Sequence, residues 1–452
     1  MKYHLIGIGG AGMSVVAELL VNRGHEVCGS DREDSAVLQH LETLGVKTFL
    51  GHAAENLAAD AIVVRSSAIK GDNPELALAL ERGQQVLHRS EALALASAGL
   101  DFIAVAGAHG KTSTTGILAT AFGALGLDPS RAIGGSLAGG ISGAYLGTGT
   151  MLVAEADESD GSFLNYSPRV ALVTNIEADH LDHYGSYENF ANAFLDFSHR
   201  IVPGGLLVTC ADDAGARKLA EAAAAAGIRV VTYGYTPGII GIPHALLTET
   251  PNLSGNCATV EFAGNEYQLK LNVPGEHMLL NAAGAWVVGQ ELGVDPEAMA
   301  AALGAFKGTS RRFEFHGEAC GIRVYDDYAH HPTEILATLK TAREISTGRV
   351  LVLFQPHLYS RTKNFKDRFA QALSLADEVV IAGAYAAREV PTDGEDGDVI
   401  AELLPGSMFV ADLHQAARAL LSKAREGDTI FTIGAGNVTT MAPEILRILE
   451  TR

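Results

Sequence analysis

The sequence predicts an α/β protein built from several domains, each with a largely parallel sheet. Short apolar runs alternate with helical stretches along the chain, and many of these runs end in glycine-rich or polar segments. Such alternation is typical of parallel strands joined by crossover helices. At 452 residues the chain exceeds one ordinary core, and about 150 residues per domain suggests roughly three domains.

Composition excludes several classes of function. Hydrophobic residues make up 47% of the chain, which supports buried cores, and 33 basic against 53 acidic residues give a net charge of −20. That charge disfavours binding to nucleic acid and to anionic membranes. The 4 cysteines are scattered without a CxxC pair, and no apolar run is long enough to span a bilayer. We therefore expect a reduced, cytoplasmic protein, a monomer or homodimer, that binds neither nucleic acid nor membrane.

The first segment, residues 1–89, opens with a predicted Rossmann-like unit. A buried strand over residues 3–8 overlaps the stretch from Gly7 to Gly12, which fits the GxGxxG pattern, and a helical run follows from Met13 to Arg23. Glycines at these positions let a diphosphate approach the helix N-terminus. The pattern alone suits either a dinucleotide or another ligand that carries a diphosphate.

Two further features of this segment lie where ligands bind in open α/β sheets. Asp31 ends the second strand, where a Rossmann unit places the acid that binds ribose. Ser66 and Ser67 follow an apolar run over residues 61–64, at the carboxyl end of a predicted strand. A simple turn explains this serine loop equally well, so both interpretations stay open.

The central segment, residues 90–307, opens with a predicted phosphate-binding loop. An apolar strand leads into the stretch from Gly107 to Thr112, and a helix follows directly. The glycines let backbone amides converge on an anion, Lys111 can reach the outer phosphates, and the hydroxyl of Thr112 can bind Mg²⁺. Val105 stands where the general P-loop signature has its first glycine, so this loop is shorter than usual. ATP is the expected ligand.

Acidic and histidine side chains follow the next two predicted strands. The strand over residues 150–154 ends in a run of acids that begins with Glu155, and the strand over residues 170–174 leads to His180. Parallel strands end at one edge of a sheet, so these side chains are candidates for a metal site. Glu155 suits Mg²⁺, whereas His180 is chemically unexpected for it, and the spaced Cys/His set of a zinc site is missing. A solvated acidic loop remains the alternative.

The end of the central segment changes character. Residues 256–273 alternate like an antiparallel β-hairpin with a turn at Gly264, which predicts a small appendage to the main sheet. His277 and Asn281 then lie at the start of a helix. Polar residues there can act as helix caps without any other role.

The last segment, residues 308–452, again places polar residues after predicted strands. Arg311 and Arg312 precede the first of them, and adjacent arginines beside a phosphate stabilise its charge, although arginines are also common on solvated surfaces. One later strand leads into residues 326–334, and the strand over residues 350–354 leads into residues 355–362. Both stretches contain histidines at the end of a predicted parallel strand.

Together these motifs resemble the Mur ligases, the ATP-dependent amide ligases of cell-wall precursor synthesis. The resemblance covers essentially the whole chain and rests on the short loop from Gly107 to Thr112, on residues 175–182, on Asn281 after His277, and on residues 311–313. Within the family, the chain is most similar to the members that use L-alanine. That likeness rests on residues 7–14, 155–160, 326–332 and 355–361.

The resemblance implies a fold and a reaction. It implies three domains: a Rossmann-like one for a UDP-sugar (residues 1–89), a central ATPase domain (90–307), and a C-terminal Rossmann-like one for the amino acid and part of the ATP pocket (308–452). The lactyl carboxylate of UDP-N-acetylmuramate would attack the γ-phosphate of ATP to form an acyl phosphate. The amine of L-alanine would then displace phosphate, with Mg²⁺ as the metal ion.

The resemblance also implies roles for individual residues. Catalysis falls to Lys111, Glu155, His180 and Arg312, and the metal to Thr112, Glu155 and His180. ATP would contact Gly107, Ala108, His109, Gly110, Lys111, Thr112, Ser113, Asn281, Arg312 and Asp327. The other substrates would contact Gly9, Gly10, Ala11, Gly12, Met13, Ser14, Asp31, Ser66, Ser67, His330, His357 and Arg361.

Three positions depart from the family pattern. Ala108 replaces a usual threonine, which matters little because backbone amides cradle the phosphate. Met278 stands where relatives commonly have asparagine, which leaves the adenine-side contacts to Asn281. Leu358 stands where some relatives have a charged residue, so Arg361 is expected to hold the alanine carboxylate.

Three alternatives are considered. A recycling ligase would join a preformed peptide to the same sugar nucleotide, but residues 158–163 favour the single-alanine enzyme. A nicotinamide-dependent oxidoreductase would use Gly7 to Gly12 and Asp31 but leaves the loop at Gly107 without a role. A non-catalytic nucleotide-binding regulator would use that loop but does not need the carboxylate and histidine clusters.

Overall fold

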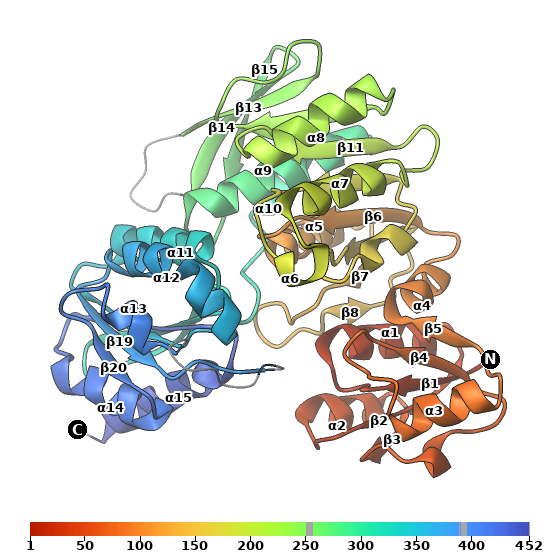
Figure 1. The fold of residues 1–452 in the computed structure, drawn as a ribbon. Helices are drawn as coiled ribbons and strands as arrows, with labels where there is room; N and C mark the ends of the chain where they lie inside the picture. Colours follow the sequence, from red (N-terminus) through yellow and green to blue (C-terminus); the bar gives the residue numbers. More distant parts are fainter. Residues whose placement is uncertain (250–255, 388, 390–395, 452) are drawn as a thin grey trace. The chain divides into compact units, whose positions relative to one another are not determined.

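The computed structural model describes the chain except residues 250–255, 388, 390–395 and 452. Its strands form three sheets, which confirms the predicted α/β fold class (Figure 1). By its internal contacts the chain divides into two compact units. The first comprises Met1–Glu249, Ala258–Lys270 and Leu280–Phe306, and the second consists mainly of Lys307–Arg452 with Leu271–Leu279.

The N-terminal sheet of the first unit has five parallel strands in the order β3-β2-β1-β4-β5. The order reverses between β1 and β4, next to the glycine-rich turn that follows β1. Its elements are β1 (Lys2–Ile6), α1 (Ala11–Asn22), β2 (Glu26–Asp31), α2 (Ala36–Thr43), β3 (Lys47–Leu50), η1 (Ala54–Asn56), β4 (Ile62–Arg65), α3 (Pro74–Glu81), β5 (Val86–His88) and α4 (Arg89–Ala96).

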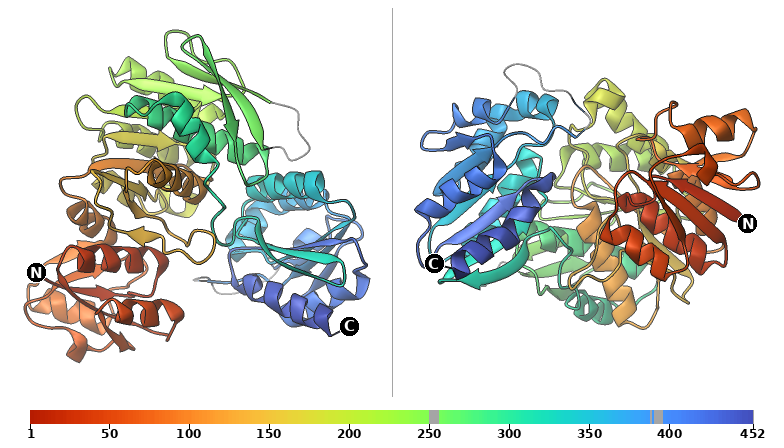
Figure 2. Two further views of the ribbon diagram at one scale, coloured as in Figure 1. Left: turned by 180° about the vertical axis from the view of Figure 1, so that it is seen from behind. Right: turned by 90° about the horizontal axis from the view of Figure 1, so that it is seen from below.

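Side chains of β1 alternate between two cores, as the period of a strand requires. Leu5 packs with residues of α1, α2 and α4 on one face of the sheet, and Ile6 packs with Leu76 of α3 on the other. Both faces are therefore covered by helices, which can be followed in Figure 2. A parallel sheet requires this because both of its faces are apolar.

The central sheet has ten strands in the order β15-β14-β13-β12-β11-β10-β6-β9-β7-β8. The predicted hairpin is confirmed as β14 and β15, but it continues the main sheet through β13, a strand that was not predicted. The strands are β6 (Asp101–Ala106), β7 (Ser130–Ala132), β8 (Ala144–Tyr145), β9 (Met151–Glu155), β10 (Val170–Val173), β11 (Leu206–Cys210), β12 (Val230–Gly234), β13 (His244–Glu249), β14 (Cys257–Phe262) and β15 (Asn265–Lys270).

Helices connect these strands and pack on the sheet. The predicted helix after the glycine turn is confirmed as α5, which begins at Lys111. The helices are α5 (Lys111–Ala124), η2 (Ser162–Asn165), α6 (Leu181–Tyr184), α7 (Tyr187–Ser198), α8 (Ala214–Ala225), α9 (Glu276–Glu291) and α10 (Pro296–Leu303). Strands β6, β9, β10, β11 and β12 run parallel, so their carboxyl ends share one edge of the sheet.

The second unit holds a six-stranded sheet in the order β16-β17-β21-β18-β19-β20. Only β16 runs antiparallel to its neighbour. Val350 and Val352 of β18 face one core and Leu351 and Leu353 face the other. The elements are β16 (Glu314–Ala319), β17 (Ile322–Asp327), α11 (Pro332–Ile345), β18 (Val350–Phe354), α12 (Tyr359–Leu373), β19 (Glu378–Ala382), α13 (Asp398–Ala401), β20 (Met408–Val410), α14 (Leu413–Lys423), β21 (Thr429–Ile433), η3 (Asn437–Thr440) and α15 (Met441–Glu450).

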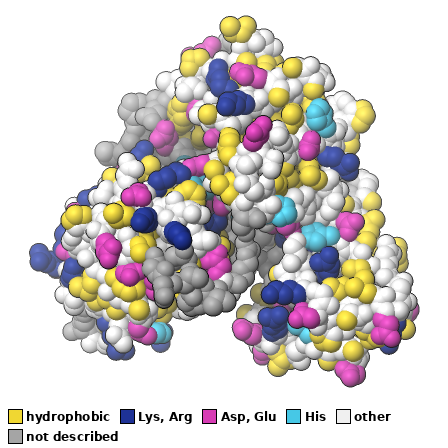
Figure 3. All heavy atoms as spheres, viewed as in Figure 1, with side chains coloured by type: hydrophobic (Ala, Val, Ile, Leu, Met, Phe, Trp, Pro, Cys, Tyr) yellow, Lys and Arg dark blue, Asp and Glu magenta, His cyan; other side chains and the backbone are white. Residues whose placement is uncertain are grey.

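Helix length and surface charge bear on whether the protein could bind membranes or charged partners. Every helix in the described part of the chain is too short or too polar to cross a bilayer. On the face shown in Figure 3, acidic and basic side chains are interspersed.

A buried ion pair lies beneath the glycine-rich turn. His4 of β1 and Glu75 of α3 are both fully buried, with His4 Nε2 3.0 Å from Glu75 Oε2. Glu75 also accepts a hydrogen bond from Ser30, whose backbone oxygen accepts the amides of Gly7 and Ile8. The pair therefore supports the strand end that holds the turn.

Titration of this pair predicts how stability depends on pH. Burial favours neutral His4, but hydrogen bonds to Cys28 and Glu75 outweigh it and raise the pKa of His4 from 6.5 to about 9. Burial also favours neutral Glu75, but hydrogen bonds from His4 and Ser30 outweigh it and lower the pKa of Glu75 from 4.5 to about 2. The His4 contribution is complete below pH 6.5 and is lost as pH rises through about 9. The Glu75 contribution is complete above pH 4.5 and is lost as pH falls through about 2.

We expect Glu75→Gln to reduce the free energy of unfolding by about 3–5 kcal/mol, because it leaves a buried imidazolium without its counter-charge. Hydrogen exchange at β1 amides against pH measures the loss in the N-terminal sheet. In the variant, the decline in protection between pH 6.5 and 9 should be much reduced. Asp60→Asn is the control, since it removes only an exposed ion pair, the one between Asp60 and Lys2. Lys2 lies in β1, the strand that contains His4. Equal protection in wild type and Glu75→Gln would contradict a stabilising role.

Candidate active site

The phosphate-type loop follows β6 and has a strained, glycine-dependent shape. Gly107 has a φ of 131° and Gly110 a φ of 83°, both in the region that favours glycine. A Cβ on Gly107 would lie 2.2 Å from Thr174 Oγ1. The end of β10 braces the loop, because Asn175 Oδ1 accepts the amide of His109 at 2.9 Å and Thr174 Oγ1 donates to the His109 carbonyl at 2.6 Å. The loop is therefore preorganised by its neighbouring strand.

Lys111 is held by its own loop and by one buried carboxylate. Its Nζ donates to the carbonyl of Gly107 at 2.6 Å, to that of Ala108 at 3.3 Å, and to Glu158 Oε1 at 2.8 Å. Burial opposes the charge, but the nearby carboxylates Glu158 and Asp157 outweigh it and raise the pKa of Lys111. The ammonium is therefore charged and lies between the carbonyls of its own loop and Glu158.

Glu158 was not singled out from the sequence, yet it lies at the centre of this charge cluster. Its side chain is fully buried, and its backbone oxygen accepts a hydrogen bond from Tyr184 Oη at 2.5 Å. In the described part of the chain Glu158 Oε2 has no hydrogen-bond partner. A buried carboxylate oxygen without a donor is costly, so this atom has unused capacity to bind a cation.

Thr112 and Glu155 lie together, as the sequence suggested. Thr112 Oγ1 donates to Glu155 Oε2 at 3.1 Å, and Glu155 Oε1 accepts the amide of Gly134 at 2.7 Å. A hydroxyl and a carboxylate oxygen are ligands that Mg²⁺ prefers. The contact between Thr112 and Glu155 therefore fits the start of a magnesium site.

His180 lies close to the same oxygen of Glu158 as Lys111. Its Nε2 is 3.6 Å from Glu158 Oε1 and 3.7 Å from Asp179 Oδ2, and its backbone has a φ of 52°. Burial favours the neutral ring, but the hydrogen bond to Glu158 and the charge of Asp179 outweigh it and raise the pKa of His180. The neighbouring acids thus favour the charged form of His180, whereas metal binding requires the neutral ring.

The acidic side chains at and after the end of β9 face two different parts of the first unit. Glu155 and Glu158 face the phosphate-type loop, as described above. Asp157 Oδ2 instead accepts a hydrogen bond from Arg89 at 3.0 Å, and Asp160 accepts one from Ser67 and lies 3.5 Å from His88. This stretch, residues 155–160, is called the acid loop below. It contacts both the N-terminal and the central sheet of the first unit, which the sequence had not indicated.

The glycine-rich turn after β1 has the predicted form. Asp31 braces it, because Asp31 Oδ2 accepts the amide of Gly9 at 2.8 Å. Because this carboxylate oxygen already accepts a loop amide, Asp31 is bound within the turn and is not positioned to bind a ribose. Met13 and Ser14 are buried, with Met13 in the hydrophobic core. The first turn of α1, around Gly12, therefore carries the amides available to an anion.

Other predicted site residues of the first unit lie around these two turns. Asn281 of α9 is buried next to the phosphate-type loop, since a Cβ on Gly110 would lie 2.9 Å from Asn281 Oδ1. His109 Nε2 lies 3.3 Å from Glu177 Oε2. Ser113 is buried in the first turn of α5, whereas Ser66 is only partly buried after β4.

In the second unit, the adjacent arginines Arg311 and Arg312 make different contacts. Arg311 has a φ of 60° and donates to the carbonyl of Gly434 at 2.7 Å, so it joins two loops. Arg312 stacks over the Tyr328 ring at 5.0 Å, and its Nη1 is 3.5 Å from Glu334 Oε1. Asp327 accepts two backbone amides at 2.8 Å. Its burial raises its pKa to about 6, against the opposing charge of Arg312.

His330, His357 and Arg361 come together at the ends of β17 and β18. The rings of His330 and His357 lie 5.9 Å apart, and Arg361 Nη1 is 3.5 Å from His357 Nδ1. Tyr385 stacks on His357 at 5.8 Å, a neighbour that the sequence did not reveal. Burial lowers the pKa of His330 to about 3, so the ring is neutral. The cluster combines a buried arginine with aromatic walls, which suits a small amino acid with a carboxylate.

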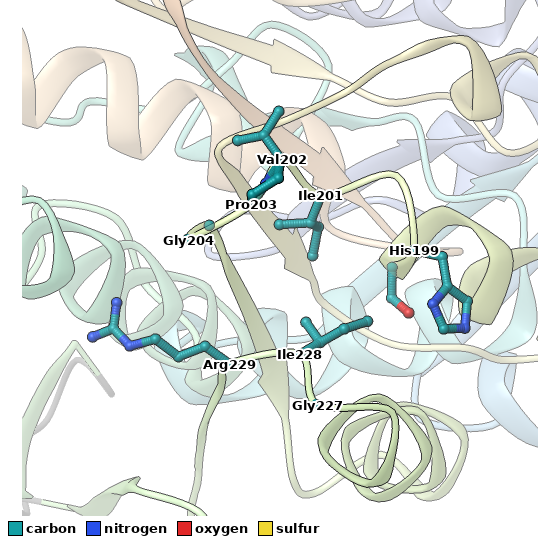
Figure 4. A pocket seen from close by; sticks show the side chains of 10 residues that line it. His199, Ile201, Val202, Pro203, Gly204, Gly227, Ile228 and Arg229 are labelled. Carbon is teal, nitrogen blue, oxygen red and sulfur yellow. The ribbon is translucent and has the colours of Figure 1, made fainter.

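A pocket of about 250 Å³ lies elsewhere, at residues 198–205 and 227–229 (Figure 4). Its loops precede β11 and β12, whereas the phosphate-type loop follows β6. Because these strands are parallel, the pocket lies at the opposite edge of the sheet. It is therefore separate from the candidate active site.

The chain matches three family models, one after another along its length. The model described as Mur ligase family, catalytic domain, matches residues 2–99, that of the Mur ligase middle domain matches residues 105–289, and that of the Mur ligase, glutamate ligase domain, matches residues 311–436. The chain belongs to the Mur ligase family. Like other Mur ligases, the protein is an ATP-dependent ligase with N-terminal, middle and C-terminal domains of the family.

Individual relatives cover the whole length of this Mur ligase. The UDP-N-acetylmuramate--L-alanine ligase of Kineococcus radiotolerans is 50% identical over 100% of this chain and 97% of that protein. The enzyme of the same name from Saccharopolyspora erythraea is 49% identical over 99% and 93%. A solved UDP-N-acetylmuramate-alanine ligase from Thermotoga maritima has a TM-score of 0.81 at 30% identity, covering 100% and 99%. A murein peptide ligase from Psychrobacter arcticus has a TM-score of 0.73 at 26% identity, covering 100% and 99%.

The loop geometry predicts that Gly107→Ala disables nucleotide binding. The new Cβ would collide with Thr174 and force a φ that alanine avoids, so we expect a stability loss of about 1–3 kcal/mol and binding of a non-hydrolysable ATP analogue weakened about 10-fold or more. Calorimetric titration and thermal unfolding measure the two effects. Gly123→Ala in α5 is the matched control, since its Cβ meets nothing within 4 Å and the change should stabilise the helix. Unchanged binding by Gly107→Ala would show that the loop does not hold phosphate.

Proposed function

We propose that the protein joins L-alanine to the lactyl carboxylate of UDP-N-acetylmuramate at the expense of ATP, in peptidoglycan precursor synthesis. The proposal is carried by one constellation, in which Lys111, Thr112 and Glu155 converge at the carboxyl edge of a parallel sheet. The names of the relatives that are 49–50% identical over the whole chain support the choice of substrates.

ATP is proposed to bind at the loop from Gly107 to Ser113, with Asn281 beside it. Backbone amides of the loop and the N-terminus of α5 cradle the phosphates, and Lys111 contributes a full charge. Mg²⁺ would be held by Thr112 and Glu155, with His180 or Glu158 nearby, and would neutralise charge on the transferring phosphoryl group. Arg312 and Asp327 are proposed to complete the nucleotide pocket.

The UDP-sugar is proposed to bind at the turn from Gly9 to Ser14. The first turn of α1 receives the diphosphate, while Ser66 and Ser67 lie at the end of the neighbouring strand β4. Asp31 shapes the turn through Gly9. L-Alanine is proposed to bind at His330, His357 and Arg361, where the guanidinium receives its carboxylate.

The chain's residues support the reaction by positioning and charge. A carboxylate attacking a triphosphate meets strong repulsion, and Lys111 offsets it because its ammonium is buried and preorganised. The product of this step is an acyl phosphate, which the amine of L-alanine then attacks. With a pKa of about 3, His330 is too weak a base to accept the amine proton at neutral pH, so it orients the substrate as a neutral ring.

A recycling ligase that accepts a preformed peptide is the alternative, favoured by the likeness to a murein peptide ligase over the whole chain. We expect phosphate release from ATP only when UDP-N-acetylmuramate and L-alanine are both present. Each amino acid in turn, and a tripeptide, are tested in the same assay. Release with the tripeptide and none with L-alanine would establish the alternative and leave the family assignment unchanged.

Lys111→Ala is expected to lower turnover by about 100-fold or more, because one charge contact in a transition state is worth about 3 kcal/mol. Steady-state phosphate release measures the effect, and thermal unfolding checks that the variant folds. Lys270→Ala, at the end of the exposed strand β15, is the control and should turn over normally. Near-normal turnover by Lys111→Ala would remove this loop from the mechanism.

A further inference from the structure

Tyr385 lies beside the histidine cluster of the second unit, and two backbone hydrogen bonds hold it there. It follows β19, and its amide donates to the Pro356 carbonyl at 2.8 Å. Its own carbonyl accepts the amide of Leu358 at 3.0 Å. Pro356 and Leu358 flank His357 after β18, so the two backbones are joined on either side of that histidine. The segment that carries His357 therefore determines the place of Tyr385.

The Tyr385 ring packs against both His357 and the backbone that follows β21. It stacks on the imidazole with a centroid distance of 5.8 Å and an interplanar angle of 17°. A Cβ on Gly436 would lie 2.6 Å from Tyr385 Cγ, so the ring keeps this place only beside a glycine. Tyr385 is 41% exposed and lies outside both cores of this sheet. Its ring is therefore fixed by the cluster and not by burial in a core.

The orientation of the His357 ring decides which of its atoms can meet a substrate. Arg361 Nη1 lies 3.5 Å from His357 Nδ1, and a guanidinium has only donors, so this contact leaves the ring proton on Nε2. An N–H at Nε2 suits an acceptor such as the carboxylate of an amino acid. A rotation of the ring would break the contact with Arg361 and turn this donor away.

The stack with Tyr385 opposes such a rotation. A parallel ring covers one face of the imidazole and restricts its turning about the Cβ–Cγ bond, whereas the His330 ring meets it at 69°. The contact with Arg361 is at the long limit of a hydrogen bond and restrains the ring weakly. Aromatic pairs contribute interaction beyond their buried area, equivalent to about 2- to 10-fold in an equilibrium constant.

We propose that Tyr385 is a positioning residue for the amino-acid substrate, because it fixes the His357 ring that receives the substrate carboxylate together with Arg361. It acts through His357 and does not touch the reacting atoms. The inference rests on the proposed function, which places L-alanine at this cluster. ATP and the UDP-sugar are proposed to bind through other residues, so the effect of Tyr385 is confined to the amino acid.

The experiment is steady-state phosphate release by the full chain, with each of the three substrates varied in turn while the others are saturating. Tyr385→Leu removes the ring but keeps the backbone hydrogen bonds, and should raise the KM for L-alanine about 5- to 10-fold. The turnover number and the KM values for ATP and UDP-N-acetylmuramate should stay within about 2-fold of wild type. Tyr385→Phe keeps the stacked ring and should have the wild-type KM for L-alanine.

A second variant displaces the ring without removing it. In Gly436→Ala the new Cβ would meet Tyr385 Cγ at 2.6 Å and Gln355 Oε1 at 2.5 Å, so the ring has to move from His357. The KM for L-alanine should rise as it does in Tyr385→Leu. Because both changes remove the same contact, the double variant should have a KM no higher than the larger single value. Effects that multiply in the double variant would contradict the proposal.

Phe315→Leu is the matched control. Phe315 is an exposed aromatic residue of the same sheet, and its ring packs against Tyr325 at 5.2 Å instead of against the histidine cluster. Its substitution should leave all three KM values unchanged. Circular dichroism and thermal unfolding establish that each variant is folded, and Gly436→Ala tests the proposal even where Tyr385→Leu does not fold.

The outcomes separate this inference from the proposed function. Absence of phosphate release with L-alanine in the wild type would overturn the proposed function and the inference with it. Release by the wild type, with an unchanged KM for L-alanine in Tyr385→Leu or with equal rises in all three KM values, would overturn the positioning role alone. A KM in Tyr385→Phe as high as in Tyr385→Leu would also overturn it, because the hydroxyl and not the stacked ring would then be responsible.

Discussion

The contact between Lys111 and Glu158 is the interaction on which the rest of the active site depends. It places a buried ammonium against the short phosphate-type loop, where Glu158 Oε1 and two loop carbonyls hold it. An unpaired charge at this depth would be costly, so the acid loop must follow β9 at this point of the sheet. The positions of Glu155, His180 and Asp157 are consequences of that placement, because each belongs to or contacts the same loop.

The protein uses strand ends to preorganise charge. Thr174 and Asn175 follow β10 and fix the phosphate-type loop that follows β6, its neighbour in the sheet. The buried pair of His4 and Glu75 acts similarly in the N-terminal sheet, where it fixes the end of β2 through Ser30. In both places a polar network under a glycine turn holds the amides ready for an anion, so that little reorganisation is needed when a ligand binds.

Much of the fold followed from sequence patterns, and the features that the sequence did not predict have clear physical causes. The glycine turns predicted α1 and α5 because glycine spacing, lysine and threonine are local features. The strand β13 was missed because its neighbours in the sheet, not its own short pattern, determine that it pairs. Arg89 and Glu158 were not predicted as site residues because their contacts depend on partners that lie 68 and 47 residues away in the chain.

The sequence by itself determined the α/β class, the membership of the Mur ligase family and the position of the phosphate-type loop, because these depend on residue types at short spacing. Only the tertiary structure decided which part of the molecule each acid of residues 155–160 contacts. The sequence favoured Glu155 among four carboxylates in six consecutive residues but did not separate the other three. In the structure Glu155 and Glu158 face the phosphate-type loop, and Asp157 and Asp160 face the N-terminal sheet. That division depends on which distant cations reach them, and long-range electrostatics becomes visible only when the sheets are assembled.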